Sequence, residues 1–390
     1  MQRILIIVPS FNSGGTVSSL INFASLIDKT RFQISVFAIT TSGPNKGFVA
    51  EHCTIIGDNN NRQGKTATSL KGAIRTKLFA TVKSIKKLLE KLHIDISPLL
   101  FKRYAQKLDT GEYDYVLAFQ EGQATLFGSY FKHGTKVAWV RCEYTRLVNG
   151  VGNKYNACYE KYDKIVSVSK AALSSFLSVL PQYRDIAYVQ YNFLNDERIL
   201  SLSKEKVDDL WSDDGVFTIV TLGRIDPVKR VSEIPRISRE LIDMGLKFRW
   251  VIIGGVAAKD KSEYDLLVDN IKKYRVQDNV IITGNKPNPY PYLKRCDFLV
   301  SLSKSETFNN TLTEAKILGV PVVTTNYPCA CESINNNREG LVVSFDNVIT
   351  AIADMIKDKS HIYSLIKENM STYHYDKESL LQQLYTNILY

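Results

Sequence analysis

Short apolar runs alternate with glycine-rich or helical stretches from the start of the chain. Residues 4–8 are continuously apolar, a glycine pair follows at 14–15, apolar residues then recur at helical spacing up to residue 27, and a second apolar run covers 32–39. Strand, turn, helix and strand in this order form a βαβ unit of a parallel sheet. Further strands are expected at 113–118, 136–140 and 164–168, followed by a helix at 170–179.

A second series of the same kind begins after a polar stretch at 195–215. Its strands are expected at 217–222, 248–253, 280–283, 298–302, 320–324 and 340–344, with a helix at about 311–318. The first three strands end directly in glycine, which places these glycines at the carboxyl edge of the sheet, where open α/β folds bind ligands. Gly-x-Gly-x-x-Gly is absent from both halves, which argues against a dinucleotide-dependent dehydrogenase.

Two such series in 390 residues predict two doubly wound α/β domains. We expect a first domain at 1–194, with a helical insertion at about 62–107, and a second domain at 195–372. The last stretch, 373–390, has apolar residues on one helical side and is expected to cross back to the first domain. The six cysteines lack the spacing of a zinc site, and no metal site is expected.

The positive charge of the chain is concentrated in one segment. The net charge is +10, and residues 62–107 carry twelve Lys or Arg against two acidic residues. Such a basic field attracts phosphate-rich partners, whether membrane lipid, nucleic acid or a diphosphate-linked substrate. Apolar residues from Leu78 to Leu92 form a helical stripe, which can lie on a membrane or pack on the domain. Phe79, the one aromatic residue among the cations of 70–91, lies on this stripe, so nucleic acid is not an expected partner.

Apolar runs are too short for either a membrane span or a secretion signal. None approaches the roughly 20 residues that cross a bilayer. The apolar stretch before Pro9 has about five residues, too few for the core of a signal peptide. We therefore expect a cytoplasmic protein, with peripheral contact to the inner face of the cell membrane through Arg62–Lys107 as an open alternative.

Two glutamates, Glu306 and Glu314, flank the expected start of a helix that follows a strand. Free N–H groups at a helix start favour a phosphate or diphosphate, and carboxylates accept hydrogen bonds from the hydroxyls of sugar rings. The alternative is structural, since Thr311 to Glu314 has the spacing of a capping box. Upstream, Arg224 and Lys229 follow the strand that ends at Gly223, and both can bind phosphate oxygens.

Together these motifs resemble the retaining glycosyltransferases of family 4, which have the GT-B fold of two Rossmann-like domains facing a central cleft. Gly223-Arg224 with Lys229 is similar to the diphosphate-binding pair of that family, and Glu306 with Glu314 is similar to its Glu-x7-Glu motif. The resemblance is strongest to the branch that builds capsular and cell-surface polysaccharides. Its further motifs are 14–15, 119–122, 138–140, 162–169, 288–292 and the residues from 315 to 323.

The resemblance implies metal-independent transfer from a nucleoside-diphosphate sugar, UDP-linked, with no other cofactor and with retained anomeric configuration. Arg224, Lys229 and Glu306 would be catalytic, the cations by neutralising the leaving diphosphate and Glu306 by holding hydroxyls of the transferred sugar. Glu314 would hold the ribose. The implied donor-binding residues are Gly14, Gly15, Gly223, Arg224, Lys229, Gly284, Lys286, Thr307, Phe308, Asn309, Asn310, Thr311 and Glu314.

The chain departs from the family pattern at three positions. Thr307 and Asn309 stand where the family often has glycines, and Arg141 stands where it commonly has histidine. Arginine cannot act as a base near neutral pH, so Arg141 is instead a candidate contact to a charged acceptor or to the diphosphate. Glu121 and Glu143 are further candidates on the acceptor side, with a structural role as the alternative for each.

The acceptor is expected to be a growing cell-surface glycan or a lipid-diphosphate-linked glycan, which the basic segment would favour. A glycosyltransferase for a small soluble acceptor is the rival within the same class. A non-catalytic protein that binds nucleotide sugars or nucleic acid is the rival from another class.

Overall fold

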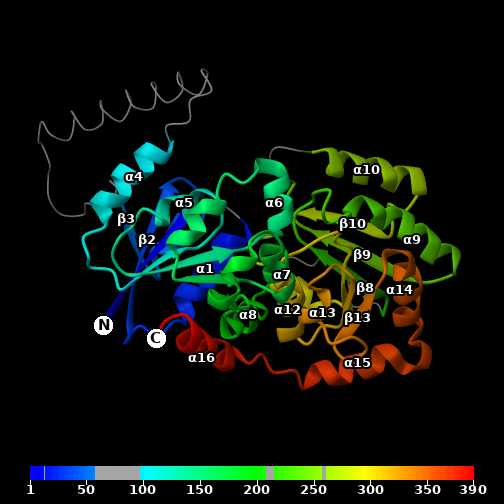
Figure 1. The fold of residues 1–390 in the computed structure, drawn as a ribbon. Coiled ribbons are helices and arrows are strands. Elements are labelled where there is room, and N and C mark those ends of the chain that lie inside the picture. The colour runs from blue at the N-terminus through cyan, green and yellow to red at the C-terminus, as the bar shows by residue number, and fades with distance from the viewer. Residues whose placement is uncertain (13, 58–96, 208–214, 257–260) are drawn as a thin grey trace, which may run out of the picture. The chain divides into compact units, whose positions relative to one another are not determined.

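The computed structural model describes the chain of 390 residues apart from residues 13, 58–96, 208–214 and 257–260. The chain forms two compact units, the first from residues 1–167, 176–188 and 384–390 and the second from 168–175 and 189–383. Each unit contains one β-sheet with helices packed on it (Figure 1). Most of the expected insertion at 62–107, including its apolar stripe, lies outside the described residues. The domain boundaries given above stay a prediction.

The first unit is built on a seven-stranded sheet with the order β3-β2-β1-β4-β5-β6-β7. Its strands are β1 (Gln2–Ser10), β2 (Phe32–Thr40), β3 (Thr54–Ile56), β4 (Tyr115–Ala118), β5 (Thr135–Val140), β6 (Lys164–Ser167) and β7 (Ala187–Val189). β1 pairs in parallel with both β2 and β4, so the strand order reverses direction between β1 and β4. This reversal is the topological switch point at which doubly wound sheets bind ligands.

Helices connect these strands. They are α1 (Gly15–Leu26), α2 (Lys46–Ala50), α4 (Ser97–Leu108), α5 (Gln123–Gly128), α6 (Tyr144–Val151) and α7 (Lys170–Val179), with 3₁₀ turns at Asn156–Lys161 and Pro181–Ile186. The last helix, α16 (Lys377–Asn387), runs from the second unit into the first. Lys164 at the start of β6 is buried, and its Nζ donates to the carbonyl oxygens of Asn387 and Ile388 at 2.9 and 3.2 Å. The last turn of α16 is thereby joined to the first sheet.

The second unit repeats the topology with six strands in the order β10-β9-β8-β11-β12-β13. Its strands are β8 (Phe217–Leu222), β9 (Phe248–Ile253), β10 (Val280–Gly284), β11 (Phe298–Ser301), β12 (Val322–Thr325) and β13 (Gly340–Val343). β8 pairs in parallel with β9 and with β11, so the switch point lies between β8 and β11.

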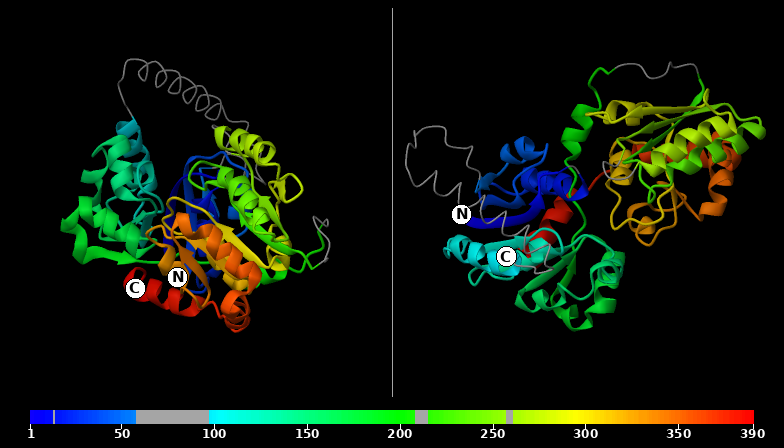
Figure 2. Two further views of the ribbon diagram at one scale, coloured as in Figure 1. Left: turned by 90° about the vertical axis from the view of Figure 1, so that its right-hand side faces the viewer. Right: turned by 90° about the horizontal axis from the view of Figure 1, so that it is seen from above.

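Helices cover both faces of this sheet (Figure 2). One face is covered by α9 (Ile234–Asp243), α10 (Ser262–Tyr274), α14 (Val348–Lys357) and α15 (Ile362–Ser371). The other face is covered by α8 (Asp196–Leu202), α11 (Tyr290–Arg295), α12 (Asn310–Ile317) and α13 (Ala330–Ser333). The remaining 3₁₀ turns are Val231–Glu233, Phe345–Asn347 and Lys359–His361.

The side chains of β9 alternate between two separate cores. Trp250 and Ile252 pack in the cluster under α9 and α14, whereas Val251 and Ile253 pack in the cluster under α11 and α12. All four side chains are buried, and each contributes about 1.5–3 kcal/mol by leaving water. Burial on both faces explains why these strands are continuous apolar runs in the sequence.

Candidate functional site

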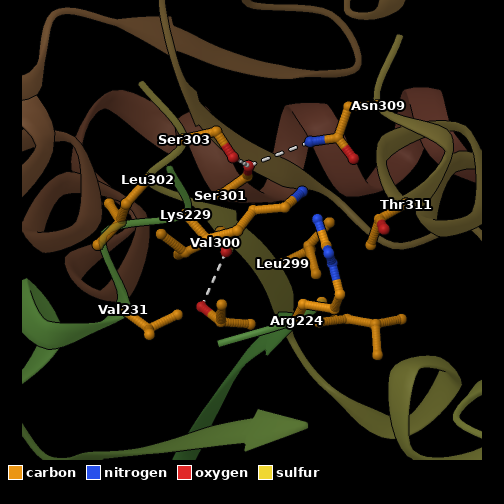
Figure 3. Close-up of a pocket in the computed structure, with 13 residues that line it drawn as sticks. Arg224, Lys229, Val231, Leu299, Val300, Ser301, Leu302, Ser303, Asn309 and Thr311 are labelled. Carbon is orange, nitrogen blue, oxygen red and sulfur yellow. Dashed lines mark hydrogen bonds between the residues drawn. The ribbon is translucent and has the colours of Figure 1, made fainter. Parts of the chain in front are cut away.

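A pocket lies at the switch point of the second sheet. It opens beside the carboxyl ends of β8 and β11 and the start of α12 (Figure 3). Its lining residues are Thr221, Leu222, Gly223, Arg224, Lys229, Val231, Leu299, Val300, Ser301, Leu302, Ser303, Asn309 and Thr311. Five predicted donor-binding residues are thus brought together here, namely Gly223, Arg224, Lys229, Asn309 and Thr311.

Close backbone packing holds the edge of the pocket after β8. Gly223 N–H donates to the carbonyl oxygen of Ile253 at 3.0 Å, and Gly254 N–H donates to that of Gly284 at 2.9 Å. A Cβ atom at Gly254 would lie 1.7 Å from the carbonyl oxygen of Gly223, so this position accepts only glycine without a backbone shift. Gly223 itself has φ of 151°, a conformation that glycine adopts most readily. The glycines after these strands therefore let three strand ends converge beside the pocket.

Arg224 and Lys229 are placed by a tight turn at Asp226. Asp226 Oδ1 accepts from the backbone N–H groups of Val228 and Lys229 at 3.0 and 3.2 Å, and its Oδ2 pairs with Arg224 Nη2 at 3.1 Å. An aspartate that caps its own turn in this way fixes the backbone without a longer secondary structure. In Figure 3 the charged ends of Arg224 and Lys229 point into the same part of the pocket. The Arg224 side chain is 69% exposed, so it is accessible to an anion.

Glu306 lies directly against this basic pair. Its Oε1 forms an ion pair with Lys229 Nζ and also accepts from Ser303 Oγ at 2.8 Å. The two charged side chains are 22% and 16% exposed, which makes the pair partly buried. Lys229, which follows β8, thus contacts Glu306, which follows β11.

Hydrogen bonds across three strands form the floor of the pocket. Trp250 Nε1 on β9 donates to Thr221 Oγ1 on β8 at 3.0 Å, and that hydroxyl donates to the carbonyl oxygen of Val300 on β11 at 2.8 Å. The buried amide of Asn309 donates to Ser301 Oγ and Tyr327 Oη, both at 3.2 Å. These two hydrogen bonds join the loop before α12 to the end of β11 and to Tyr327.

Glu314 lies in α12 as the fifth residue of the helix, because the helix begins at Asn310. The capping-box interpretation is therefore wrong: Thr311 is the second helical residue, and Asn309 is the N-cap. Glu314 Oε1 instead lies 3.4 Å from Tyr290 Oη. Burial raises the pKa of the Glu314 carboxyl to about 7, against the lowering effects of the Tyr290 hydroxyl and of Lys229. The side chain is thus poised to change charge near neutral pH.

Several other predicted donor-binding residues do not line the pocket. Phe308 packs on Tyr191 with ring centroids 5.8 Å apart, and Asn310 Oδ1 accepts from Asn192 Nδ2 at 3.0 Å. Lys286 Nζ lies 5.6 Å from the ring centroid of Tyr292. The carbonyl oxygen of Gly284 accepts from Gly254 N–H, and Thr307 lies in the loop between β11 and α12. Their roles in donor binding stay predictions.

The predicted residues of the first unit follow three of its strands, β1, β4 and β5. Gly14 is the N-cap residue of α1, with φ of 151°, and among the described residues no other part of the chain would crowd a Cβ placed at Gly14 or Gly15. The backbone N–H of Arg141, after β5, donates to Glu121 Oε2 at 2.7 Å. The link of these residues to donor or acceptor stays a prediction.

The Arg141 side chain lies over Phe119, to whose carbonyl oxygen its Nε donates at 2.8 Å, with its Cζ 4.0 Å from the ring centroid. Burial lowers the pKa of Arg141 to about 9, and Glu121 opposes the shift, so the guanidinium is charged at neutral pH. The contact of Arg141 with a charged acceptor or with the diphosphate stays a prediction. Glu143 is exposed and is the N-cap residue of α6.

Sequence reasoning missed Thr221, Ser301 and Tyr290 as parts of the site. Thr221 and Ser301 are polar residues at or next to the carboxyl ends of largely apolar strands, and this position was a usable signal. The contact from Tyr290 to Glu314 joins α11 to α12 and has no sequence signal. Among the described residues, no group of three or more His, Cys, Asp or Glu is arranged to hold a metal ion.

The part of the chain that lines this pocket is similar to known proteins. Residues 203–373 match the family model "Glycosyl transferases group 1". The chain is 29% identical over 206 residues to a Campylobacter jejuni N-acetylgalactosamine-N,N'-diacetylbacillosaminyl-diphospho-undecaprenol 4-alpha-N-acetylgalactosaminyltransferase, covering 51% of this chain and 52% of that protein. It is 27% identical over 163 residues to the Staphylococcus aureus capsular polysaccharide biosynthesis glycosyltransferase CapM, covering 40% of each. The chain thus spans about half the length, or less, of these curated relatives.

The fold is similar to that of Anabaena HepE, solved in complex with UDP, over 100% of this chain and 99% of that one, with a TM-score of 0.69 and 16% identity. The two parallel-sheet units and this likeness confirm the prediction of a GT-B fold with two Rossmann-like domains. The arrangement of the domains around a central cleft stays a prediction. The family model and both curated relatives are described as glycosyltransferases.

Proposed function

We propose that this protein is a retaining, metal-independent glycosyltransferase that moves a sugar from a UDP-sugar to a growing cell-surface or lipid-linked glycan. The observation that carries the proposal is the ion pair between Glu306 and Lys229, where Lys229 lines the pocket at the switch point of the second sheet together with Arg224. Cations for a diphosphate and a carboxylate for sugar hydroxyls are thus adjacent. The matched family and the UDP complex of a protein with the same fold support the same donor class.

In the proposed reaction, the acceptor hydroxyl attacks the anomeric carbon from the face that the diphosphate leaves. A bond forms between the acceptor oxygen and the anomeric carbon, the bond to the diphosphate oxygen breaks, and the diphosphate takes the acceptor proton. Negative charge grows on the diphosphate as the bond breaks, and Arg224 and Lys229 would stabilise this charge more in the transition state than in the ground state. Glu306 would hold the sugar through its hydroxyls and not act as a nucleophile.

Release of nucleotide diphosphate from a panel of UDP- and GDP-sugars tests the proposal. We expect release with at least one UDP-sugar, increased by the correct glycan or lipid-diphosphate acceptor. Analysis of the anomeric configuration of the product tests retention. No release from any donor, with membranes added, would contradict the enzyme assignment and favour a binding protein.

Metal independence gives a separate prediction. We expect Arg224 and Lys229 to supply the positive charge that a divalent cation supplies in other transferases. Excess EDTA is therefore expected to change the initial rate by less than about twofold. The measurement is nucleotide release before and after dialysis against EDTA, with added Mg²⁺ or Mn²⁺ as the comparison. Loss of activity that either metal restores would contradict the prediction.

Glu314 gives a prediction about pH. Burial raises the pKa of this carboxyl above its ordinary value, so the folded protein holds the proton up to about pH 7. The ionised form, present above that pH, is the better acceptor for two ribose hydroxyls. We therefore expect affinity for UDP to fall by up to about tenfold between pH 8 and pH 6. Glu314→Gln removes this dependence and leaves only the titration of UDP itself; identical pH profiles of the two proteins would contradict the prediction.

The acceptor and the location of the protein are inferred from the positive charge of one segment. The basic segment 62–107 would attract a lipid-diphosphate carrier at the inner face of the membrane, in which case vesicle binding falls as salt rises. Within the described part of the chain, no helix is both long enough and apolar enough to cross a bilayer. Absence of vesicle binding at moderate salt would favour a small, freely diffusing acceptor. No cofactor beyond the nucleotide sugar and no nucleic-acid partner are proposed.

A further inference from the structure

The two cations of the pocket are each held by a carboxylate of the protein itself. Arg224 pairs with Asp226, and Lys229 pairs with Glu306. These four side chains carry no net charge together. A diphosphate that enters the pocket therefore meets cations that already have anionic partners. Its binding free energy is less favourable, because each cation must leave its carboxylate or divide its hydrogen bonds between the carboxylate and the diphosphate.

The pair between Lys229 and Glu306 is the more constrained of the two. Ser303 Oγ donates to the same oxygen of Glu306 that Lys229 contacts, and the backbone carbonyl of Glu306 accepts from Cys329 Sγ at 3.1 Å. The carbonyl of Ser303 is in turn fixed by Thr325 Oγ1 at 2.6 Å. The carboxylate is thus anchored, whereas the lysine ammonium ends a flexible chain that lines the pocket. Lys229 is the partner that can turn to a ligand.

We propose that Glu306 acts as a built-in counter-ion that competes with the nucleotide diphosphate for Lys229 and thereby weakens the binding of the free nucleotide product. This inference rests on the proposed function and adds to it. Free UDP must draw Lys229 away from an anchored carboxylate and gains no contact with it in return. A UDP-sugar places hydroxyls within reach of Glu306, so the carboxylate that loses the lysine gains new hydrogen bonds. The same side chain would therefore favour the donor over the spent nucleotide.

A double-mutant cycle on UDP binding tests this inference without use of turnover. UDP affinity is measured by calorimetry for the unsubstituted chain, Glu306→Gln, Lys229→Gln and the double variant. We expect Glu306→Gln to bind UDP about tenfold more tightly, which corresponds to about 1.4 kcal/mol. In the Lys229→Gln background the same change is expected to alter affinity by less than about twofold, because no lysine remains to be released.

Controls separate this effect from a general change of charge or of folding. The amide introduced by Glu306→Gln keeps an oxygen that can accept from Ser303, so melting temperatures are expected to stay close, and they are measured for each variant. Glu240→Gln removes the carboxylate from another ion pair, with Arg236, and Arg236, unlike Lys229, does not line the pocket. It is expected to leave the affinity for UDP unchanged.

Two results would overturn the inference and leave the proposed function intact. One is unchanged or weaker UDP binding by Glu306→Gln. The other is an equal gain in UDP affinity from Glu306→Gln with and without Lys229, which would indicate that Glu306 simply repels the negative charge of UDP. If neither UDP nor GDP binds the unsubstituted chain or any variant, the proposed function fails and the inference fails with it.

Discussion

Replacement of Lys229 by methionine is expected to lower kcat by about 10²–10³-fold, with a smaller effect on the binding of the donor. Methionine keeps an unbranched apolar side chain beside Gly223, whose ideal Cβ position lies 3.5 Å from Lys229 Cε, but it removes the charge that would stabilise the leaving diphosphate. An interaction that strengthens as the bond breaks lowers kcat more than it raises KM when it is lost. The measurement is steady-state nucleotide release with the best donor.

Lys304→Met is the matched control for this experiment. Lys304 is an exposed lysine in the loop between β11 and α12, near Glu306 in sequence, and it does not line the pocket. Its replacement is expected to change kcat by less than about twofold. Because Lys229→Met leaves a partly buried Glu306 without its cation, the melting temperature is recorded too, and Lys229→Met/Glu306→Gln is expected to recover most of any loss. Near-normal turnover of a folded Lys229→Met protein would remove Lys229 from the mechanism.

Replacement of Gly254 by alanine is expected to destabilise the second unit by about 3 kcal/mol, or roughly 6–12 °C in melting temperature. The added Cβ would lie 1.7 Å from the carbonyl oxygen of Gly223, and neither backbone can yield without loss of its hydrogen bonds to Ile253 and Gly284. The forced shift moves Arg224, the next residue, away from its place in the pocket. Weaker UDP binding is therefore expected together with the lower melting temperature, measured by calorimetry on the same preparation.

The neighbouring glycine provides a control for this change. A Cβ at Gly255 would lie 3.6 Å from Asn285 Cβ, which is ordinary van der Waals contact. Gly255→Ala is therefore expected to shift the melting temperature by no more than about 2 °C and to bind UDP as the unsubstituted chain does. Equal effects of the two substitutions would show that crowding at Gly223 does not control the pocket edge.

The strands could be predicted from the sequence because most of them are buried on both faces. A run such as residues 248–253 is apolar throughout apart from Arg249, and β9 has these bounds in the structure. The helix at 170–179 is likewise confirmed as α7. β3 and β7 were missed because each has three residues, too few to form a recognisable pattern. Sequence reasoning therefore found the strands between which the switch points lie, but not these two.

The candidate site was predictable to the extent that it depends on strand ends. Gly223, Arg224 and Lys229 follow one strand and Asn309 and Thr311 follow another, and the parallel topology brings them to one pocket. The role of Glu314 was less predictable. Its capping alternative came from spacing alone, and it fails because the N-cap is Asn309, two residues before Thr311. The raised pKa of Glu314 depends on burial beside Tyr290, which no local sequence pattern encodes.

The alternation of β9 between two cores restricts how this protein can change in evolution. A single residue inserted or deleted within the strand would exchange Trp250 and Ile252 with Val251 and Ile253, so that both cores would be filled with side chains of the wrong size. Length variation is therefore expected to collect in the segments that follow the strands. A change of length in such a segment leaves both cores intact, whereas a change of length within β9 disturbs both cores at once.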